Sequence, residues 1–152
     1  MKKVILLTLV SLSLLSANAQ STKAYAITAD VKGSYNWISV KEIDMSTGEV
    51  VNSIFDPASS KFNLKTVDGQ TLSSRSMFDL PTYSGVAAAA FDEKNNRLYF
   101  TNMRGSELRY FDLNTKEQVT VVVNSDPAFN TGSKSGEENV ITRMVIAADG
   151  YG

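Results

Sequence analysis

The sequence predicts an all-β protein with antiparallel strands. Short runs rich in Val, Ile, Tyr, Phe and Thr recur along the chain, and clusters of Gly, Asn, Asp and Ser separate them. After the first 19 residues, no segment keeps the apolar 3.6-residue period of an amphipathic helix over three turns. Together these observations favour short strands joined by tight turns.

The clearest unit runs from Val86 to Val123. Polar turns divide it into four expected strands: residues 86–91, 97–102, 107–112 and 118–123. The alternative for the alanine-rich first strand is a helix, because Ala is the strongest helix former. Gly85 and Asp92 flank that run and leave six residues, too few for a stable isolated helix. The unit is therefore expected to form one up-and-down sheet of four strands.

Parts of this unit have earlier counterparts. Residues 25–28 match 98–101, and residues 40–47 match 108–115. The offset is 73 for the first pair and 68 for the second, so the earlier copy has a longer loop near residues 33–36. Self-similarity over several tens of residues indicates a repeat architecture of stacked or radially arranged sheets.

The repeated turns share an aspartate. Asp44 and Asp112 occupy matching positions, and an Asp side chain can bond the backbone of its own turn. We interpret both as turn residues rather than as metal ligands or catalytic groups. A third copy is expected near the end, where residues 142–150 match 85–93.

The phrase FDEKNNRLYFTNMRGSELRYFDLNTKE, residues 91–117, resembles the blades of bacterial exported β-propellers of the loosely repeated kind. It departs from the WD40 pattern, because the chain has no Trp-Asp pair and no Gly-His. The resemblance implies antiparallel four-stranded blades, about two of them and the start of a third. Since propellers typically have four to eight blades, it also implies the N-terminal fragment of a longer propeller. The expected units are blade 1 at about 24–55, a hairpin insert at about 56–84, blade 2 at about 85–123, a loop at 124–139 and the start of blade 3 at 140–152.

Within the insert, Asp68-Gly69 separates residues 62–67 from 70–72, which is a strong signal for a two-residue hairpin turn.

The first 19 residues read as a cleavable signal peptide. Lys2 and Lys3 precede an apolar run of about 12 residues, and Ala17-Asn18-Ala19 fits the small-x-small rule, so cleavage is expected between Ala19 and Gln20. The alternative is an uncleaved anchor or a buried helix, but a spanning helix needs about 20 residues. Without Cys, a lipid-modified N-terminus is excluded. We expect an exported chain, periplasmic or extracellular, with no stable membrane insertion after cleavage of the leader.

Composition excludes several classes of function. The chain has no His and no Cys, which removes Ser-His-Asp and Cys-His catalysis, disulfides and thiolate or imidazole metal sites. Without the leader's two lysines, 13 basic residues face 16 acidic ones and the net charge is −3. No basic run exceeds two residues, so no nucleic-acid partner is expected. No cofactor, metal or catalytic residue is predicted in this segment.

Three residues are candidates for binding. Tyr35, Trp37 and Arg104 lie in or beside turns that a propeller would place on one face, and aromatic side chains mark recognition surfaces. The alternative is that Trp37 packs within its own sheet and Arg104 is a solvated turn residue. The acid pairs Asp92-Glu93 and Glu137-Glu138 lack EF-hand spacing and are expected to be solvated turn acids.

The functional expectation is a non-catalytic binding or scaffold module for a protein, peptide or glycan ligand. The alternative is part of a secreted or periplasmic propeller enzyme, a hydrolase or lyase acting on glycan or peptide. Its catalytic residues would lie mostly in further blades. A propeller hosts both functions, so the fold does not choose between them.

Overall fold

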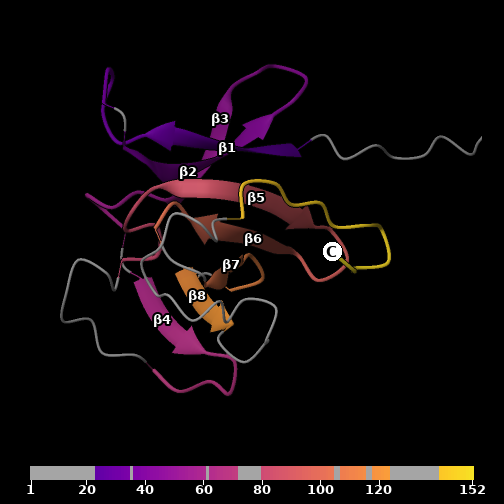
Figure 1. Cartoon of the computed structure of the whole chain (residues 1–152). Coiled ribbons are helices and arrows are strands. Elements are labelled where there is room, and N and C mark those ends of the chain that lie inside the picture. Colours follow the sequence, from indigo (N-terminus) through magenta and orange to yellow (C-terminus); the bar gives the residue numbers. More distant parts are fainter. Residues whose placement is uncertain are drawn as a thin grey trace, which may run out of the picture.

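The computed structural model describes residues 23–34, 36–60, 62–71, 80–104, 107–115, 118–123 and 141–152. These residues form an all-β structure, and none of them is helical, which confirms the predicted fold class at that level. The strands are β1 (Lys23–Ala29), β2 (Trp37–Asp44), β3 (Val50–Phe55), β4 (Phe62–Thr66), β5 (Val86–Asp92), β6 (Arg97–Asn102), β7 (Leu108–Asp112) and β8 (Gln118–Val123). They are arranged in two sheets (Figure 1).

The first sheet has the order β1-β2-β3 and is antiparallel throughout. The turn after β2 is built by Asp44, whose Oδ1 accepts hydrogen bonds from the Ser46 amide at 2.7 Å and the Thr47 amide at 3.3 Å. Gly48 closes this turn with a φ of 73°, in the left-handed region that glycine adopts without strain. The expected turn role of Asp44 is confirmed.

The second sheet has the order β4-β8-β7-β6-β5. Its last four strands form an antiparallel meander in chain order, with registers such as Leu98↔Phe111 between β6 and β7. The observed bounds agree with the expected ones to within one residue, because each strand stops at a polar turn. In the turn after β7, the Asn114 amide donates to Oδ1 of Asp112 at 2.9 Å, so the turn role of this aspartate is also confirmed.

Strand β4 joins the sheet in a way that the sequence did not predict. The Asp68-Gly69 turn forms, since the Gly69 amide donates to the Thr66 carbonyl at 2.9 Å. Beyond this turn, however, the described residues of the insert add one isolated bridge, Lys65↔Thr71. Instead, β4 runs parallel to β8, from Phe62↔Gln118 onward. Such a long-range parallel pairing has no local turn to signal it.

The expected first strand of a third unit is not formed. Residues 141–147 pair with no strand of the described chain, and a strand exists only where a neighbouring backbone completes its hydrogen bonds. A turn does follow, in which the Gly150 amide donates to the Ala147 carbonyl at 2.9 Å. Side chains fix this segment to the second sheet: Thr101 Oγ1 donates to the Ile141 carbonyl at 2.8 Å, and Lys94 Nζ to the Asp149 carbonyl at 2.7 Å.

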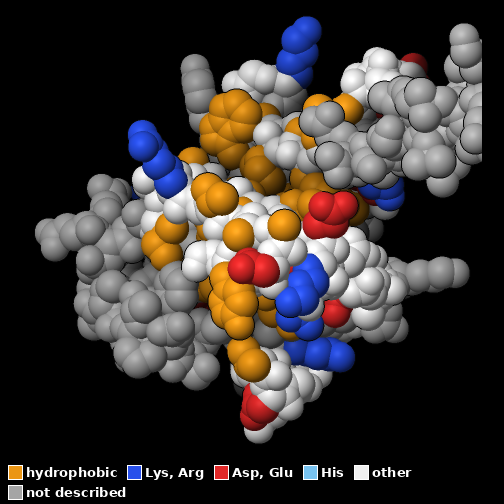
Figure 2. Space-filling model, turned by 90° about the vertical axis from the view of Figure 1, so that its right-hand side faces the viewer, with side chains coloured by type: hydrophobic (Ala, Val, Ile, Leu, Met, Phe, Trp, Pro, Cys, Tyr) orange, Lys and Arg blue, Asp and Glu red, His pale blue; other side chains and the backbone are white. Residues whose placement is uncertain are grey.

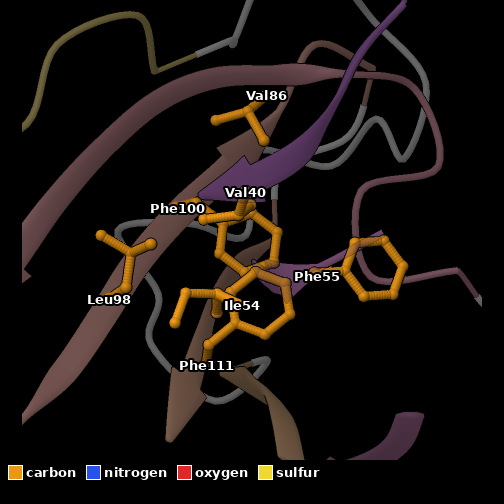
Figure 3. Close-up of a cluster of buried hydrophobic side chains, with 7 residues drawn as sticks. All are labelled: Val40, Ile54, Phe55, Val86, Leu98, Phe100 and Phe111. Carbon is orange, nitrogen blue, oxygen red and sulfur yellow. The ribbon is translucent and has the colours of Figure 1, made fainter. Parts of the chain in front are cut away.

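The core lies where the two sheets pack against each other (Figure 3). The Phe111 ring of β7 stacks on Phe55 of β3 with centroids 5.7 Å apart, and on Phe100 of β6 with centroids 4.9 Å apart. A second aromatic contact joins Tyr25 of β1 and Phe91 of β5 at 4.8 Å. The buried cluster consists of Val40, Ile54, Phe55, Val86, Leu98, Phe100 and Phe111.

Candidate functional site

A polar groove of about 330 Å³ opens between the two sheets, and we call it the inter-sheet groove. Both sheets contribute to its walls, and so do the turns after β5 and β7. It is lined by Lys23, Tyr25, Glu42, Asn52, Ser53, Ile54, Asn96, Phe111, Asp112, Leu113 and Thr115. A pocket of this size lies at the lower end of the range for small-molecule sites.

Glu42 is the most unusual residue of the groove. It lies two positions after Val40 on β2 and therefore on the same, core-facing side of the sheet. A buried carboxylate needs a partner, because desolvation costs several kcal/mol. Lys23, at the start of β1, supplies it with Nζ 2.8 Å from Oε1 of Glu42. The Glu42 side chain is 10% exposed and that of Lys23 is 61% exposed, so the lysine covers the carboxylate from the solvent side.

The ion pair fixes the charges in the groove. The hydrogen bond and the negative charge of Glu42 raise the pKa of Lys23 above its ordinary value. Burial, followed by the charge of Glu42, raises the pKa of Tyr25 as well. Lys and Tyr side chains are protonated at neutral pH even at their ordinary pKa values, and both shifts are upward, so both side chains are hydrogen-bond donors there.

The opposite wall is held by contacts between two turns. Asn96 adopts a φ of 51°, a left-handed conformation that Asn tolerates better than most residues. Its Nδ2 donates to Oδ1 of Asn114 at 3.0 Å, and Nδ2 of Asn114 donates to the Asn95 carbonyl at 3.0 Å. The Leu113 amide also donates to the Asn96 carbonyl at 3.0 Å. This reciprocal bonding holds Asn96 and Leu113 in place before any ligand arrives.

A second hollow of about 420 Å³ adjoins the inter-sheet groove. It is lined by Lys23, Glu42, Asp44, Val51 and Asn52. Lys23, Glu42 and Asn52 line both spaces, so the ion pair lies between them. A ligand longer than the groove would extend past this pair.

The binding residues predicted from sequence lie elsewhere. Tyr35 is outside the described residues. Trp37 is 45% exposed at the start of β2, and Arg104 is exposed in the turn after β6. Gly85 lies between the start of β2 and the turn after β6, because a Cβ placed on it would be 3.7 Å from the Trp37 carbonyl and 3.5 Å from Met103 Sδ. We call the region formed by Trp37, Gly85, Met103 and Arg104 the Trp37 rim.

The Trp37 rim and the groove lie at opposite ends of the strands. The rim lies beside the start of β2 and the end of β6, whereas the groove is lined by residues near the end of β2 and just before the start of β6. A six-residue strand is roughly 20 Å long. The structure therefore brings the backbone of Trp37 near the turn that carries Arg104, but both are remote from Glu42. Their role in binding stays a prediction.

A buried polar network positions the rim by fixing the segment before β5. The Arg109 guanidinium donates from Nη1 to the carbonyls of Leu80 at 3.0 Å and Pro81 at 3.1 Å. Nδ2 of Asn102 donates to the same Pro81 carbonyl at 3.1 Å. Thr82 Oγ1 then donates to the Ile38 carbonyl of β2 at 2.8 Å, which ties the two sheets together.

Of the two acid pairs that the sequence offers, Asp92-Glu93 lies within the described residues, and it belongs to the turn after β5. Oδ1 of Asp92 accepts the Asn95 amide at 3.0 Å and Oδ2 accepts Asn95 Nδ2 at 2.7 Å, which confirms the turn role of this aspartate. The expectation that Asp92 is solvated is wrong, because it is 1% exposed and these bonds replace those to water. Burial works to raise the pKa of Asp92, but these hydrogen bonds outweigh it and hold the pKa below its ordinary value. Glu93 is exposed. Glu137 and Glu138, like the predicted cleavage site at Ala19 and Gln20, lie outside the described residues.

Across the parts of the chain that the structure describes, no three acidic side chains gather in a way that would hold a metal ion. Charge is also dispersed on the face in Figure 2, where acidic and basic side chains lie among hydrophobic ones and neither sign forms a single patch.

The sequence reasoning missed Glu42, Asn52 and Asn96. The sequence does carry a signal for Glu42, because this charged residue falls on the apolar side of an alternating strand. Asn52 and Asn96 gave no such signal, since Asn is common in strand edges and turns.

No helix in the described ranges has the length and apolar character to cross a membrane. Comparison with known protein families, curated proteins and solved structures finds no match to this chain.

Proposed function

We propose that this chain is an exported, non-catalytic binding or scaffold module of β-propeller type, and that its ligand binds in the inter-sheet groove. The observation that carries the proposal is the groove itself: side chains from both sheets converge on one hollow, and a buried carboxylate lies in its wall. Buried charge beside a hollow is more typical of a functional site than of a packed core.

The protonation states of the groove favour binding over acid–base catalysis. A general base needs a pKa near the working pH. Lys23 and Tyr25 instead have raised pKa values and remain protonated, and Glu42 is committed to its ion pair with Lys23. Such groups hold a ligand through fixed donors and acceptors.

The propeller assignment is supported by strand order. Strands β5 to β8 follow one another as an antiparallel meander, which is the connectivity expected of a blade. Strands β1 to β3 repeat that connectivity and pack against the meander through Phe55 and Phe111.

Export is tested by expressing the gene in a bacterium with its leader intact. The proposal predicts that the product leaves the cytoplasm and that mass spectrometry finds a mature chain beginning at Gln20. A protein that stays in the cytoplasm with residues 1–19 attached contradicts export.

Binding is tested by thermal shift of the chain against a panel of sugars, peptides and metabolites. Any compound that binds only the folded chain raises the midpoint of thermal unfolding, because it stabilises the fold by about 2.7 kcal/mol when its concentration is 100 times the dissociation constant. The proposal predicts a hit whose effect is lost in Asn52→Ala. Conversion of a panel compound into product by the chain contradicts a non-catalytic role.

A further inference from the structure

We infer that the inter-sheet groove takes a neutral, hydroxyl-rich ring, that is, one unit of a carbohydrate. This inference rests on the proposed binding function and adds the class of ligand. It is carried by the kinds of side chain that line the groove and by how they are held.

The lining combines apolar and hydrogen-bonding surfaces in one hollow. Four apolar or aromatic residues contribute: Tyr25 and Leu113, which are half-buried, and Ile54 and Phe111, which are buried behind them. Polar residues contribute as well: Asn52, Ser53, Asn96 and Thr115. Two of them already bond within the protein, since the Ser53 hydroxyl accepts from Lys41 Nζ at 3.0 Å and Thr115 Oγ1 donates to the Asp112 carbonyl at 3.3 Å. A purely apolar ligand would desolvate the second group without replacing its hydrogen bonds, which costs free energy. A sugar ring offers a C–H face to the first group and hydroxyls to the second.

The charges in the groove disfavour an anion. Lys23 supplies the basic group among the lining residues, and it already pairs with Glu42 at 2.8 Å. The Asp112 carboxylate adds a further negative charge to the wall. An anionic ligand would meet two carboxylates and would have to take Lys23 from its partner. A neutral ligand keeps the pair intact and hydrogen-bonds to both of its members, and bonds to charged groups are the stronger ones.

The groove is also rigid in the places where a sugar would bind. Asn96 is held by bonding between turns, and Tyr25 is packed against the Phe91 ring at 4.8 Å. Pre-organised side chains lose little conformational entropy on binding, which favours recognition of a small, weakly attractive ligand. The adjoining hollow beside Asn52 and Glu42 has room for a second unit.

The experiment is an NMR titration of the full chain with four neutral disaccharides: maltose, cellobiose, lactose and N,N′-diacetylchitobiose. We expect at least one of them to shift the side-chain amide signals of Asn52 and Asn96 at millimolar concentration. Removing one hydrogen bond to a charged group should weaken binding about tenfold in Glu42→Gln. Should that variant fail to fold, Asn52→Ala serves instead, because Asn52 is exposed. Val31→Ala is the matched control and leaves the affinity unchanged, because Val31 is exposed and lines neither hollow.

The outcomes separate the ligand class from the proposed function. Shifts at Asn52 and Asn96 caused by glucuronate, by a lysine-containing dipeptide or by a peptide library, without any from the neutral sugars, overturn the carbohydrate inference and leave the binding function standing. Sugar-induced shifts confined to the Trp37 rim also overturn it. New product signals in the one-dimensional spectra of the same samples contradict the non-catalytic role instead.

Discussion

Replacing Arg109 by Met should destabilise the fold more than any other single charge removal on the second sheet. Arg109 is 3% exposed, and its guanidinium donates to the carbonyls of Leu80 and Pro81. It also lies over the Tyr83 ring, with Cζ 5.1 Å from the centroid. The methionine side chain fills similar space but offers no donor, so these contacts are lost without a large cavity.

The magnitude follows from the partners that remain. The Pro81 carbonyl keeps its bond from Asn102, and the Leu80 carbonyl keeps a longer bond from the Tyr83 amide at 3.3 Å, so the loss is that of the charge-assisted bonds from Arg109. The ion pair with Glu107 adds little, since that carboxylate is 37% exposed and is screened by water. A charge-assisted hydrogen bond contributes about 1.5–3 kcal/mol. We therefore expect a loss of about 2–4 kcal/mol, which corresponds to a fall in Tm of about 8–16 °C for a domain of this size.

Urea unfolding followed by tryptophan fluorescence measures this loss. Trp37 is the single tryptophan of the chain, and it immediately precedes Ile38, whose carbonyl accepts the bond from Thr82. Arg104→Met is the matched control, because Arg104 is exposed, and it should change stability by less than about 0.5 kcal/mol. The assignment of Arg109 as the residue that fixes the segment before β5 would be refuted in two cases. In the first, Arg109→Met is as stable as the wild type; in the second, the Arg104→Met control loses as much stability as Arg109→Met.

Three further perturbations test the core, the turns and the rim. Phe111→Ala should lower the free energy of unfolding in urea by about 3–5 kcal/mol, because the ring is buried between both sheets. The control Val51→Ala, on the exposed side of β3, should lower it by less than about 0.5 kcal/mol. Equal effects of the two variants would contradict the packing. The lowered pKa of Asp92 means that the folded chain binds a proton at this carboxylate less tightly than the unfolded chain does. The ionised carboxylate therefore contributes stability above its ordinary pKa of 3.8, and this contribution is lost as the pH falls through the lower pKa of the folded chain. Urea midpoints measured across that range should fall less steeply in Asp92→Asn, and an unchanged slope would contradict the pKa shift. Gly85→Ala should lower the stability measured by thermal unfolding by about 1–2 kcal/mol, because a φ of 83° is unfavourable for a residue with a side chain and the new Cβ contacts Met103. A variant of wild-type stability would argue against this backbone conformation.

Local patterns were sufficient to predict most strands. The four strands of β5 to β8 follow from alternating apolar residues and from turns that contain Asn, Asp or Gly. The turn chemistry of Asp44 and Asp112 was predictable because it depends only on the next few residues.

Features that depend on distant residues were not predictable in this way. The parallel pairing of β4 with β8 joins segments far apart in the sequence, and no local signal specifies it. The groove is likewise assembled from β1, β2, β3, β7 and two turns, so its residues share no motif. Tyr35, Trp37 and Arg104 were predicted as binding residues from their place in or beside turns, and the structure adds a feature that the sequence did not show: the buried network around Arg109 that fixes the segment before β5.

Binding between the two sheets is tested most directly by intermolecular NOEs to the disaccharide that binds best. The Tyr25 ring lines the groove, whereas the Trp37 indole belongs to the opposite end of the strands. We predict NOEs from the sugar-ring protons to the Tyr25 ring and none to the Trp37 indole. NOEs to the Trp37 indole without any to Tyr25 would contradict binding in the inter-sheet groove.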